Sequence, residues 1–217
     1  MMDGPLREIQ GPAGRLEVLL EQPALPPGAT PRAAVVFAHP HPLHGGTMHT
    51  KAVYRATKAL GRIGCAVLRF NFRGVGRSEG KWDEGRGERD DFRAALDFMA
   101  ARYPNVELWA AGFSFGAWVA LTVGAVDERV SLLLGIAPAV TSYDFSVLET
   151  STKPKFFIHG ERDELIPLQA MWRFYGRLPE PKELVVIDAA NHLFDGLVLE
   201  VGDAVEDLLA DYRTPTH

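Results

Sequence analysis

The sequence has one cysteine, no run of basic residues longer than two, and no repeated or low-complexity segment. A lone cysteine cannot close a disulfide within the chain, so disulfide-stapled scaffolds are excluded and a reducing compartment is favoured. Cys65 lies in the apolar stretch 64–68 and is expected to be a packed thiol. Lys and Arg number 23 against 28 Asp and Glu, which gives a net charge of −5 and no basic footprint for nucleic acid.

Signals for secretion or for a membrane are also lacking. The sequence begins without a basic segment followed by an apolar one, so no secretion signal is expected. Leu108 to Val126 carries no charge and is close to the length of a membrane span. It contains three glycines and is flanked by Glu107 and Asp127, which favours a buried strand, a tight turn and a buried helix. We therefore expect a cytoplasmic protein, a monomer or small homo-oligomer, with no membrane or nucleic-acid partner.

The chain does contain enough apolar residues for one core, with 47% hydrophobic residues in a length of 217. Such a length buries roughly 70% of the unfolded surface, so we expect one domain over residues 1–217. An antiparallel pair of strands is predicted around residues 11–14. The short apolar runs that follow lack clean two-residue alternation, which is typical of parallel strands covered on both faces. These runs are 33–38, 66–70, 106–111, 130–136, 155–158 and 184–187.

Stripes of apolar residues with helical spacing accompany these runs. They cover 92–103, 168–178 and 194–209, and we assign their aromatic and methionine side chains to the core rather than to a cofactor site. Alternating strands and helices predict an α/β fold with a mostly parallel, doubly wound sheet of about eight strands and helices on both faces. Chemistry in such sheets collects beyond the carboxyl ends of the strands.

The segment Gly112 to Gly116 reads G-x-S-x-G and lies directly between a predicted strand and a predicted helix. A serine on such a sharp turn needs close neighbours without side chains, and its hydroxyl stands clear of the sheet at a helix N-terminus. Ser114 is therefore the candidate nucleophile. The pattern occurs again at Gly76 to Gly80, but no strand precedes and no helix follows it directly, so Ser78 is interpreted as a loop serine. Gly74 and Gly76 could begin the dinucleotide-binding motif G-x-G-x-x-G, but the motif needs glycine at position 79, which is glutamate.

A serine nucleophile needs a base to take its proton and an acid to orient that base. The acids at 161–164 follow the run 155–158, and His192 follows the run 184–187. Ser114, Asp163 and His192 then occur in the chain order Ser, Asp, His, each just past a different parallel strand and thus at one edge of the sheet. Glu161 and Glu164 are the alternative acids on these grounds.

These residues resemble the α/β-hydrolase superfamily, and within it the small bacterial serine hydrolases near the dienelactone-hydrolase-like group. The resemblance spans about residues 33–210 and is carried by the segments 39–48, 71–80, 112–116, 159–167 and 191–194. It implies Ser114 as nucleophile, Asp163 as acid rather than Glu161, with Glu164 a lesser rival, and His192 as base. Dienelactone hydrolases use a cysteine nucleophile where this chain has Ser114, so their substrate is not inherited.

The resemblance also implies an oxyanion hole made of backbone N–H groups. One comes from the residue after the nucleophile, Phe115, and the other from the loop after the first parallel strand. Pro40 and Pro42 have no N–H, which leaves His41 or Leu43, and the family's loop favours His41.

The histidines His39, His41 and His44 could in principle bind zinc, but their loop is stiffened by prolines, and we assign them to loop structure, with no metal and no cofactor. Arg73 is expected to form a structural ion pair.

The predicted activity is hydrolysis of a small-molecule acyl ester, carboxylesterase-like, through an acyl-enzyme. Alternatives are a thioesterase or peptidase on the same triad, a non-catalytic binding protein of the same fold, and a metallohydrolase. The connection 138–154 is too short for a large cap, so we predict a minimal cap or none, and a preference for short acyl chains. The predicted pocket-lining residues are Leu43, Phe113, Phe115, Phe145 and Phe194.

Overall fold

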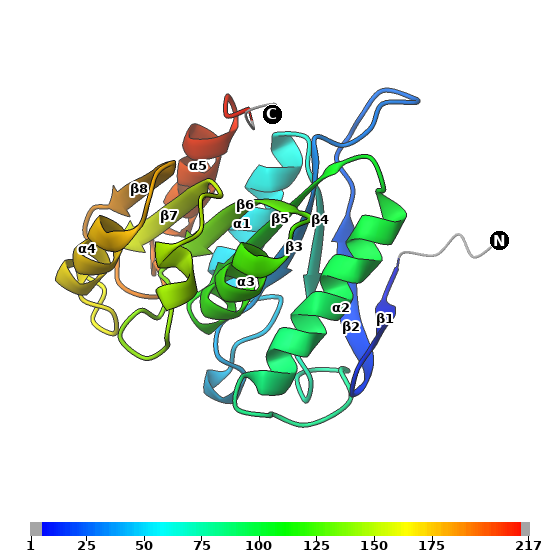
Figure 1. The fold of residues 1–217 in the computed structure, drawn as a ribbon, viewed down its shortest axis with the longest axis horizontal. Helices are drawn as coiled ribbons and strands as arrows, with labels where there is room; N and C mark the ends of the chain where they lie inside the picture. Colours follow the sequence, from blue (N-terminus) through cyan, green and yellow to red (C-terminus); the bar gives the residue numbers. More distant parts are fainter. Residues whose placement is uncertain (1–5, 214–217) are drawn as a thin grey trace.

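Eight strands form one sheet in the order β1-β2-β4-β3-β5-β6-β7-β8 in the computed structural model, which describes residues 6–213 (Figure 1). The strands are β1 (Glu8–Gly11), β2 (Gly14–Glu21), β3 (Ala33–Ala38), β4 (Ala66–Phe70), β5 (Glu107–Phe113), β6 (Val130–Ile136), β7 (Lys155–Gly160) and β8 (Lys182–Ile187). β1 and β2 form the predicted antiparallel hairpin, and β2 pairs antiparallel with β4. All remaining pairs are parallel. The predicted α/β fold with a mostly parallel eight-stranded sheet is confirmed.

The position of β3 in the sheet creates the crevice in which chemistry can occur. From β3 the chain goes to β4 on one side and then to β5 on the other, so strand order reverses at β3. The connections leaving β3 and β5 diverge at their carboxyl ends, where open α/β sheets place their ligands.

Helices cover both faces of the sheet. The α-helices are α1 (Lys51–Arg62), α2 (Arg86–Arg102), α3 (Phe115–Val126), α4 (Leu168–Arg177) and α5 (Val198–Leu209), and two 3₁₀ turns are η1 (Pro42–His44) and η2 (Ser146–Glu149). Helices α1 and α5 pack against one face, and α2, α3 and α4 pack against the other. In Figure 1, α2 and α3 lie in front of the sheet.

The central strands are apolar on both faces because each face has its own core. In β3, Val35 and Phe37 belong to the core beneath α1 and α5, whereas Val36 and Ala38 belong to the core beneath α2 and α3. All four are fully buried. Successive side chains of a strand point to opposite faces, so a run without alternation predicts burial on both sides, as these residues show.

Three helices differ from the sequence prediction. Helix α2 begins at Arg86, six residues before the apolar stripe that predicts it. Helix α1 was not predicted, because half of its six buried residues are alanine, which gives a weak apolar signal. Helix α5 begins at Val198 rather than at Phe194, since Phe194 has a φ of 56° and lies in a turn. The expected structural role of Arg73 is confirmed: its guanidinium pairs with the buried carboxylate of Asp91 at 2.7 Å.

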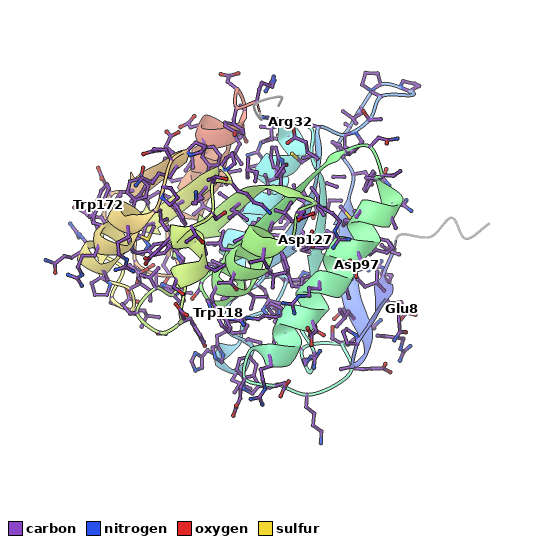
Figure 2. All side chains as sticks on the ribbon, viewed as in Figure 1. Glu8, Arg32, Asp97, Trp118, Asp127 and Trp172 are labelled. Carbon is purple, nitrogen blue, oxygen red and sulfur yellow. The ribbon has the colours of Figure 1, made fainter. Side chains whose placement is uncertain are left out.

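Side chains fill the space between the sheet and both helix layers (Figure 2). Trp172 is an exception at the outer edge of α4, with 48% of its surface exposed. The uncharged segment 108–126 forms β5, a turn and α3. None of the helices within residues 6–213 has both the length and the apolar character needed to cross a membrane.

Candidate active site

Ser114 occupies a one-residue turn between β5 and α3. β5 ends at Phe113 and α3 begins at Phe115, and Ser114 between them has a φ of 54° and a ψ of −115°. A side chain in such a conformation costs on the order of 1–3 kcal/mol, so the surrounding structure must hold it. Its N–H donates to the carbonyl of Ile136 at 2.9 Å, which fixes the turn to the end of β6.

The two glycines of this turn allow the chain to come into close contact with itself. A Cβ on residue 116 would lie 2.3 Å from the carbonyl oxygen of His39, and one on residue 112 would lie 2.3 Å from the carbonyl oxygen of Gly116. These distances are far inside van der Waals contact. Glycine is therefore required at both positions for β5 to pass directly into α3 beside the loop that follows β3.

Three side chains from three strand ends form a hydrogen-bonded chain. The Nε2 atom of His192 lies 2.9 Å from Oγ of Ser114, and its Nδ1 atom lies 2.7 Å from Oδ2 of Asp163. A carboxylate accepts only, so Nδ1 carries the proton and donates to Asp163. The lone pair of Nε2 then faces the Ser114 hydroxyl and can accept its proton.

Asp163 is held so that one oxygen faces the imidazole. Its Oδ1 atom accepts the backbone N–H groups of Leu165 at 2.9 Å and Ile166 at 2.7 Å, which leaves Oδ2 for His192. The two neighbouring acids point elsewhere. Glu161 accepts the N–H of Ala189, and Glu164 contacts only the backbone N–H of His192, at 3.4 Å. Asp163 is therefore the acid that contacts the imidazole.

Two backbone N–H groups lie free beside Ser114. Phe115 is the first residue of α3, so its N–H has no partner inside the helix. On the loop after β3, the N–H of Leu43 donates to Nδ1 of His41 at 3.2 Å, whereas the N–H of His41 itself makes no hydrogen bond within residues 6–213. His41 is thus the available donor on that loop.

A pocket of about 290 Å³ opens beside Ser114 and His192. Part of its wall comes from the connection between β6 and β7, which supplies Ala139, Ser142 and Tyr143. The other lining residues are His41, His44, Phe115, Leu165 and Ile166. No carboxylate side chain is among these lining residues.

Of the side chains predicted to line the pocket, only that of Phe115 does. Phe113 and Phe194 are fully buried beneath α1 and α5, because the alternation of β5 turns Phe113 to that face. The Phe113 ring lies 5.5 Å from the His192 imidazole and 6.1 Å from the Phe194 ring. Phe145 packs against Phe174 in the opposite core. Leu43 is 63% exposed and lies outside the pocket.

The histidines of the loop after β3 have structural contacts. His39 is fully buried; its Nδ1 donates to the carbonyl of Pro40 at 2.6 Å and its Nε2 accepts the N–H of Phe72 at 3.1 Å. Burial lowers the pKa of His39 to about 4, so the ring is neutral. Burial also lowers the pKa of His41, whose ring stacks on His44. Nowhere in residues 6–213 do three or more His, Cys, Asp or Glu side chains gather in a way that could hold a metal ion.

Several lining residues were missed by the sequence reasoning. Leu165 and Ile166 come two and three residues after Asp163, and the N–H bonds that orient its carboxylate place their side chains at the pocket. Ser142 and Tyr143 lie in the irregular connection after β6, which has no periodicity from which side-chain direction can be inferred. The proximity of Leu165 and Ile166 to the acid was the one usable signal.

Comparisons with known proteins identify the family of this chain. Residues 29–147 match the profile of the family described as serine aminopeptidase, S33. An uncharacterized protein of Rickettsia prowazekii is 38% identical over 96% of this chain and 90% of its own length. An α/β serine hydrolase homologue from Coxiella burnetii is 37% identical with a TM-score of 0.88, covering 96% of this chain and 98% of that one. An α/β serine hydrolase without a lid from Xanthomonas campestris is 34% identical with a TM-score of 0.87. The match covers 99% of this chain and 96% of that one.

The finer likeness to dienelactone hydrolases stays a prediction. The family profile covers more than half of the chain, and these relatives align with the chain over nearly its whole length. The chain therefore belongs to the serine aminopeptidase S33 family of the α/β-hydrolase superfamily.

Proposed function

We propose that this hydrolase is a serine esterase of the carboxylesterase type, which cleaves short-chain acyl esters through an acyl-enzyme on Ser114, His192 and Asp163. The observation that carries the proposal is the continuous hydrogen-bonded chain from the Ser114 hydroxyl through His192 to Asp163, with distances of 2.9 and 2.7 Å. Its open end faces the pocket that both Ser114 and His192 line. Such a chain activates a hydroxyl that is otherwise a weak nucleophile.

In the first half of the reaction, Oγ of Ser114 attacks the ester carbonyl while Nε2 of His192 takes the hydroxyl proton. Asp163 stabilises the imidazolium through the Nδ1 hydrogen bond. The carbonyl oxygen becomes an oxyanion that accepts the N–H groups of Phe115 and His41. The imidazolium then gives its proton to the leaving alcohol oxygen as the carbon–oxygen bond breaks, which leaves the acyl group on Ser114.

In the second half, water enters the site and Nε2 of His192 takes one of its protons. The hydroxide attacks the acyl carbonyl, the same two N–H groups hold the oxyanion, and the proton returns to Oγ of Ser114 as the acid is released. Loss of one oxyanion donor costs about 3–4 kcal/mol in such sites. The chain's own groups are sufficient for every step.

The lining of the pocket favours an ester over the N-terminal residue of a peptide. A serine aminopeptidase, the second candidate suggested by the family's description, must bind a free α-ammonium group. A buried ammonium needs a partner of opposite charge, and no Asp or Glu side chain is among the residues that line this pocket. An uncharged acyl group beside Phe115, Tyr143 and Leu165 meets no such requirement.

A covalent label combined with a substrate panel tests the proposal. A fluorophosphonate should form an adduct with Ser114, identified by mass spectrometry of the peptide, and Ser114→Ala should prevent it. Turnover of acyl esters, thioesters and aminoacyl anilides should then be highest for esters. Absence of an adduct would favour a non-catalytic protein of the same fold, and faster turnover of aminoacyl anilides would favour the aminopeptidase.

Acyl chain length provides the first prediction. The pocket holds about 290 Å³, and the connection between β6 and β7 contains only the turn η2, so no helical cap covers a long chain. Each buried methylene contributes about 0.8 kcal/mol and each solvated one almost nothing. The kcat/KM for p-nitrophenyl esters should therefore peak among the short acyl chains, from acetate to about hexanoate. A continued rise to dodecanoate, measured below micellar concentrations, would contradict this.

A further inference from the structure

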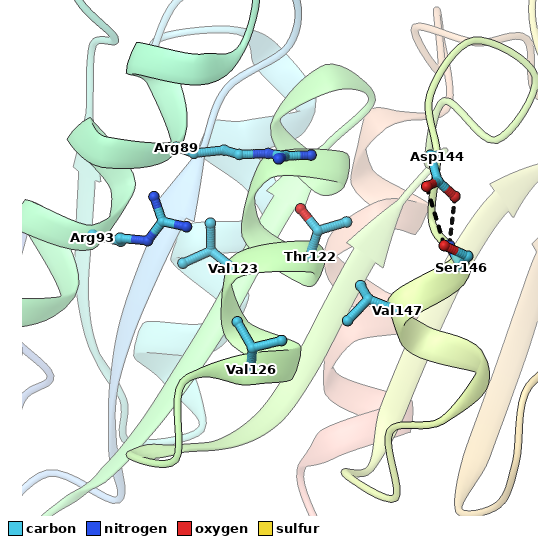
Figure 3. A pocket seen from close by; sticks show the side chains of 8 residues that line it. All are labelled: Arg89, Arg93, Thr122, Val123, Val126, Asp144, Ser146 and Val147. Atoms are coloured by element: carbon cyan, nitrogen blue, oxygen red, sulfur yellow. Dashed lines mark hydrogen bonds between the residues drawn. The ribbon is translucent and has the colours of Figure 1, made fainter.

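A second pocket lies between α2, α3 and the segment before η2, away from Ser114. It has a volume of about 280 Å³ and shares no lining residue with the pocket at Ser114. Figure 3 shows Arg89 and Arg93 projecting from α2 toward α3, with Asp144 on the far side. We call it the Arg89 pocket.

Arg89 in this pocket is not in direct contact with a carboxylate of the described residues. Its guanidinium forms no salt bridge within residues 6–213, and its Nε atom is buried without a hydrogen-bond partner there. The other two arginines nearest to it on α2 are paired: Arg86 with Asp83 at 3.1 Å, and Arg93 with Asp90 at 2.6 Å. The ring of Trp118, 4.3 Å from the guanidinium carbon, and the charge of Asp144 across the pocket both stabilise the Arg89 cation.

The groups around Arg89 favour the binding of a further negative charge. Burial and the charge of Arg93, four residues along the helix, lower the pKa of Arg89 by more than the charge of Asp144 raises it. The single carboxylate that lines the pocket, Asp144, forms no ion pair with either arginine. Both of its oxygens instead accept hydrogen bonds from Ser146, one from the backbone N–H at 2.8 Å and one from the hydroxyl at 3.1 Å. Space between the guanidinium groups and Asp144 is therefore left for a ligand.

The rest of the pocket determines what kind of anion fits. Val123 and Val126 of α3 and Val147 of η2 give it an apolar side (Figure 3). A guanidinium matches the planar geometry of a carboxylate and binds it with two parallel hydrogen bonds. We propose that the Arg89 pocket binds a small organic carboxylate, its carboxylate on Arg89 and Arg93 and its short apolar body against the three valines.

Calorimetric titration with acetate, propionate and butyrate at constant ionic strength tests the proposal. Arg89→Gln should weaken butyrate binding by about tenfold or more, because a hydrogen bond between charged groups is lost. Arg86→Gln removes the same charge from an exposed site on the same helix and should leave binding unchanged. Affinity should rise by up to about fourfold with each methylene, as expected for apolar burial. Asp144→Asn, which removes the repelling charge, should bind at least as tightly as the wild type.

Carboxylates are also products of the proposed reaction, so the titration is repeated with Ser114→Ala and with protein blocked by fluorophosphonate. Unchanged affinity in both separates this pocket from the active site, whether or not the esterase proposal holds. If Arg89→Gln does not fold, Arg93→Gln serves instead, since 48% of the Arg93 side chain is exposed. Equal binding to the Arg89→Gln and Arg86→Gln variants, loss of binding on blocking Ser114, or no saturable binding would each overturn the proposal.

Discussion

The chain contains the pattern Gly-x-Ser-x-Gly twice, and the two segments have opposite structural roles. At 112–116, the Ser114 hydroxyl faces His192 and a pocket. At 76–80, Ser78 is 7% exposed, and its hydroxyl donates to the carbonyl of Asn71 at 2.6 Å and accepts the N–H of Glu17 at 2.9 Å. The first hydroxyl is available for chemistry, and the second is fully used in joining a loop to β2.

The difference arises from what flanks each pattern. Ser114 lies between a strand and a helix that meet at one residue, which forces its φ to 54° and leaves its side chain outside both elements. Ser78 lies in a long loop between β4 and α2, where neither neighbour strains the backbone around it. The pattern Gly-x-Ser-x-Gly therefore predicts a nucleophile only where a strand directly precedes it and a helix directly follows it.

The largest expected effect separates the two serines directly. Ser114→Ala should lower kcat for a p-nitrophenyl ester by about 10⁶-fold, because nucleophile and base act as a unit. Ser78→Ala should retain a rate close to that of the wild type, since Ser78 contacts no residue of the proposed site. Steady-state kinetics with active-site titration measures both. Similar losses in the two variants would mean that the flanking elements do not distinguish them.

The next largest effect concerns the acid. Asp163→Asn should lower kcat by about 10⁴-fold, because an amide can donate to Nδ1 and so favours the wrong tautomer of His192. Glu161→Gln and Glu164→Gln remove carboxylates from the same loop. Glu161 contacts the Ala189 N–H and the Arg162 guanidinium, and Glu164 contacts the His192 N–H, so both changes should have small effects. A pH profile of kcat on all three variants checks the assignment. A comparable loss in Glu161→Gln would show that another acid serves His192.

The residues of the site could be predicted from the sequence because their placement depends on the turn glycines and on the direction of the parallel strands. The turn at Ser114 follows from its two glycines, and the meeting of Asp163 and His192 follows from parallel strands that end at one edge. Chain order and strand direction together bring residues far apart in sequence to one place. The sequence therefore predicted which residues gather.

The shape of the pocket could not be predicted in this way. Whether an aromatic residue lines a pocket or fills a core depends on the face it occupies, and Phe113 turns to the α1 and α5 face. The direction of Tyr143 is set by stacking on Trp118 at 4.4 Å, a contact between an irregular loop and a helix. Neither the face that Phe113 occupies nor the stacking of Tyr143 produces a periodic pattern in the sequence.

His39 connects the two serine segments and leads to a prediction of pH dependence. Its Nε2 accepts the N–H of Phe72 at the start of the loop that carries Ser78, and its carbonyl packs against Gly116. Burial lowers its pKa from 6.5 to about 4, so between these pH values His39 is protonated in the unfolded chain and neutral in the folded protein. The contribution of neutral His39 to the free energy of unfolding is fully present above pH 6.5. It is lost as pH falls toward 4, at up to ~1.4 kcal/mol per pH unit.

Urea unfolding across that pH window measures this slope. His39→Gln keeps an acceptor for the Phe72 N–H but cannot be protonated, so its stability should depend less on pH than that of the wild type. Part of the slope should remain, because burial also lowers the pKa of His159. His49→Gln, at an exposed position, is the control and should leave the slope unchanged. Identical slopes in all three proteins would count against a neutral His39.

The smallest expected effect is on the stability that Ser78 provides. Ser78→Ala leaves the carbonyl of Asn71 and the N–H of Glu17 without their shared partner. The bond to Asn71 is buried and the bond to Glu17 is partly buried, and an unsatisfied buried group costs about 1–3 kcal/mol. The melting temperature should therefore fall by several degrees while kcat is retained. Ser146→Ala, which removes an exposed hydroxyl, should change stability by less than about 0.5 kcal/mol. If Ser78→Ala were as stable as Ser146→Ala, the hydroxyl would not be what joins this loop to β2, and the second glycine–serine segment would need another explanation, such as the Arg15–Glu79 pair beside it.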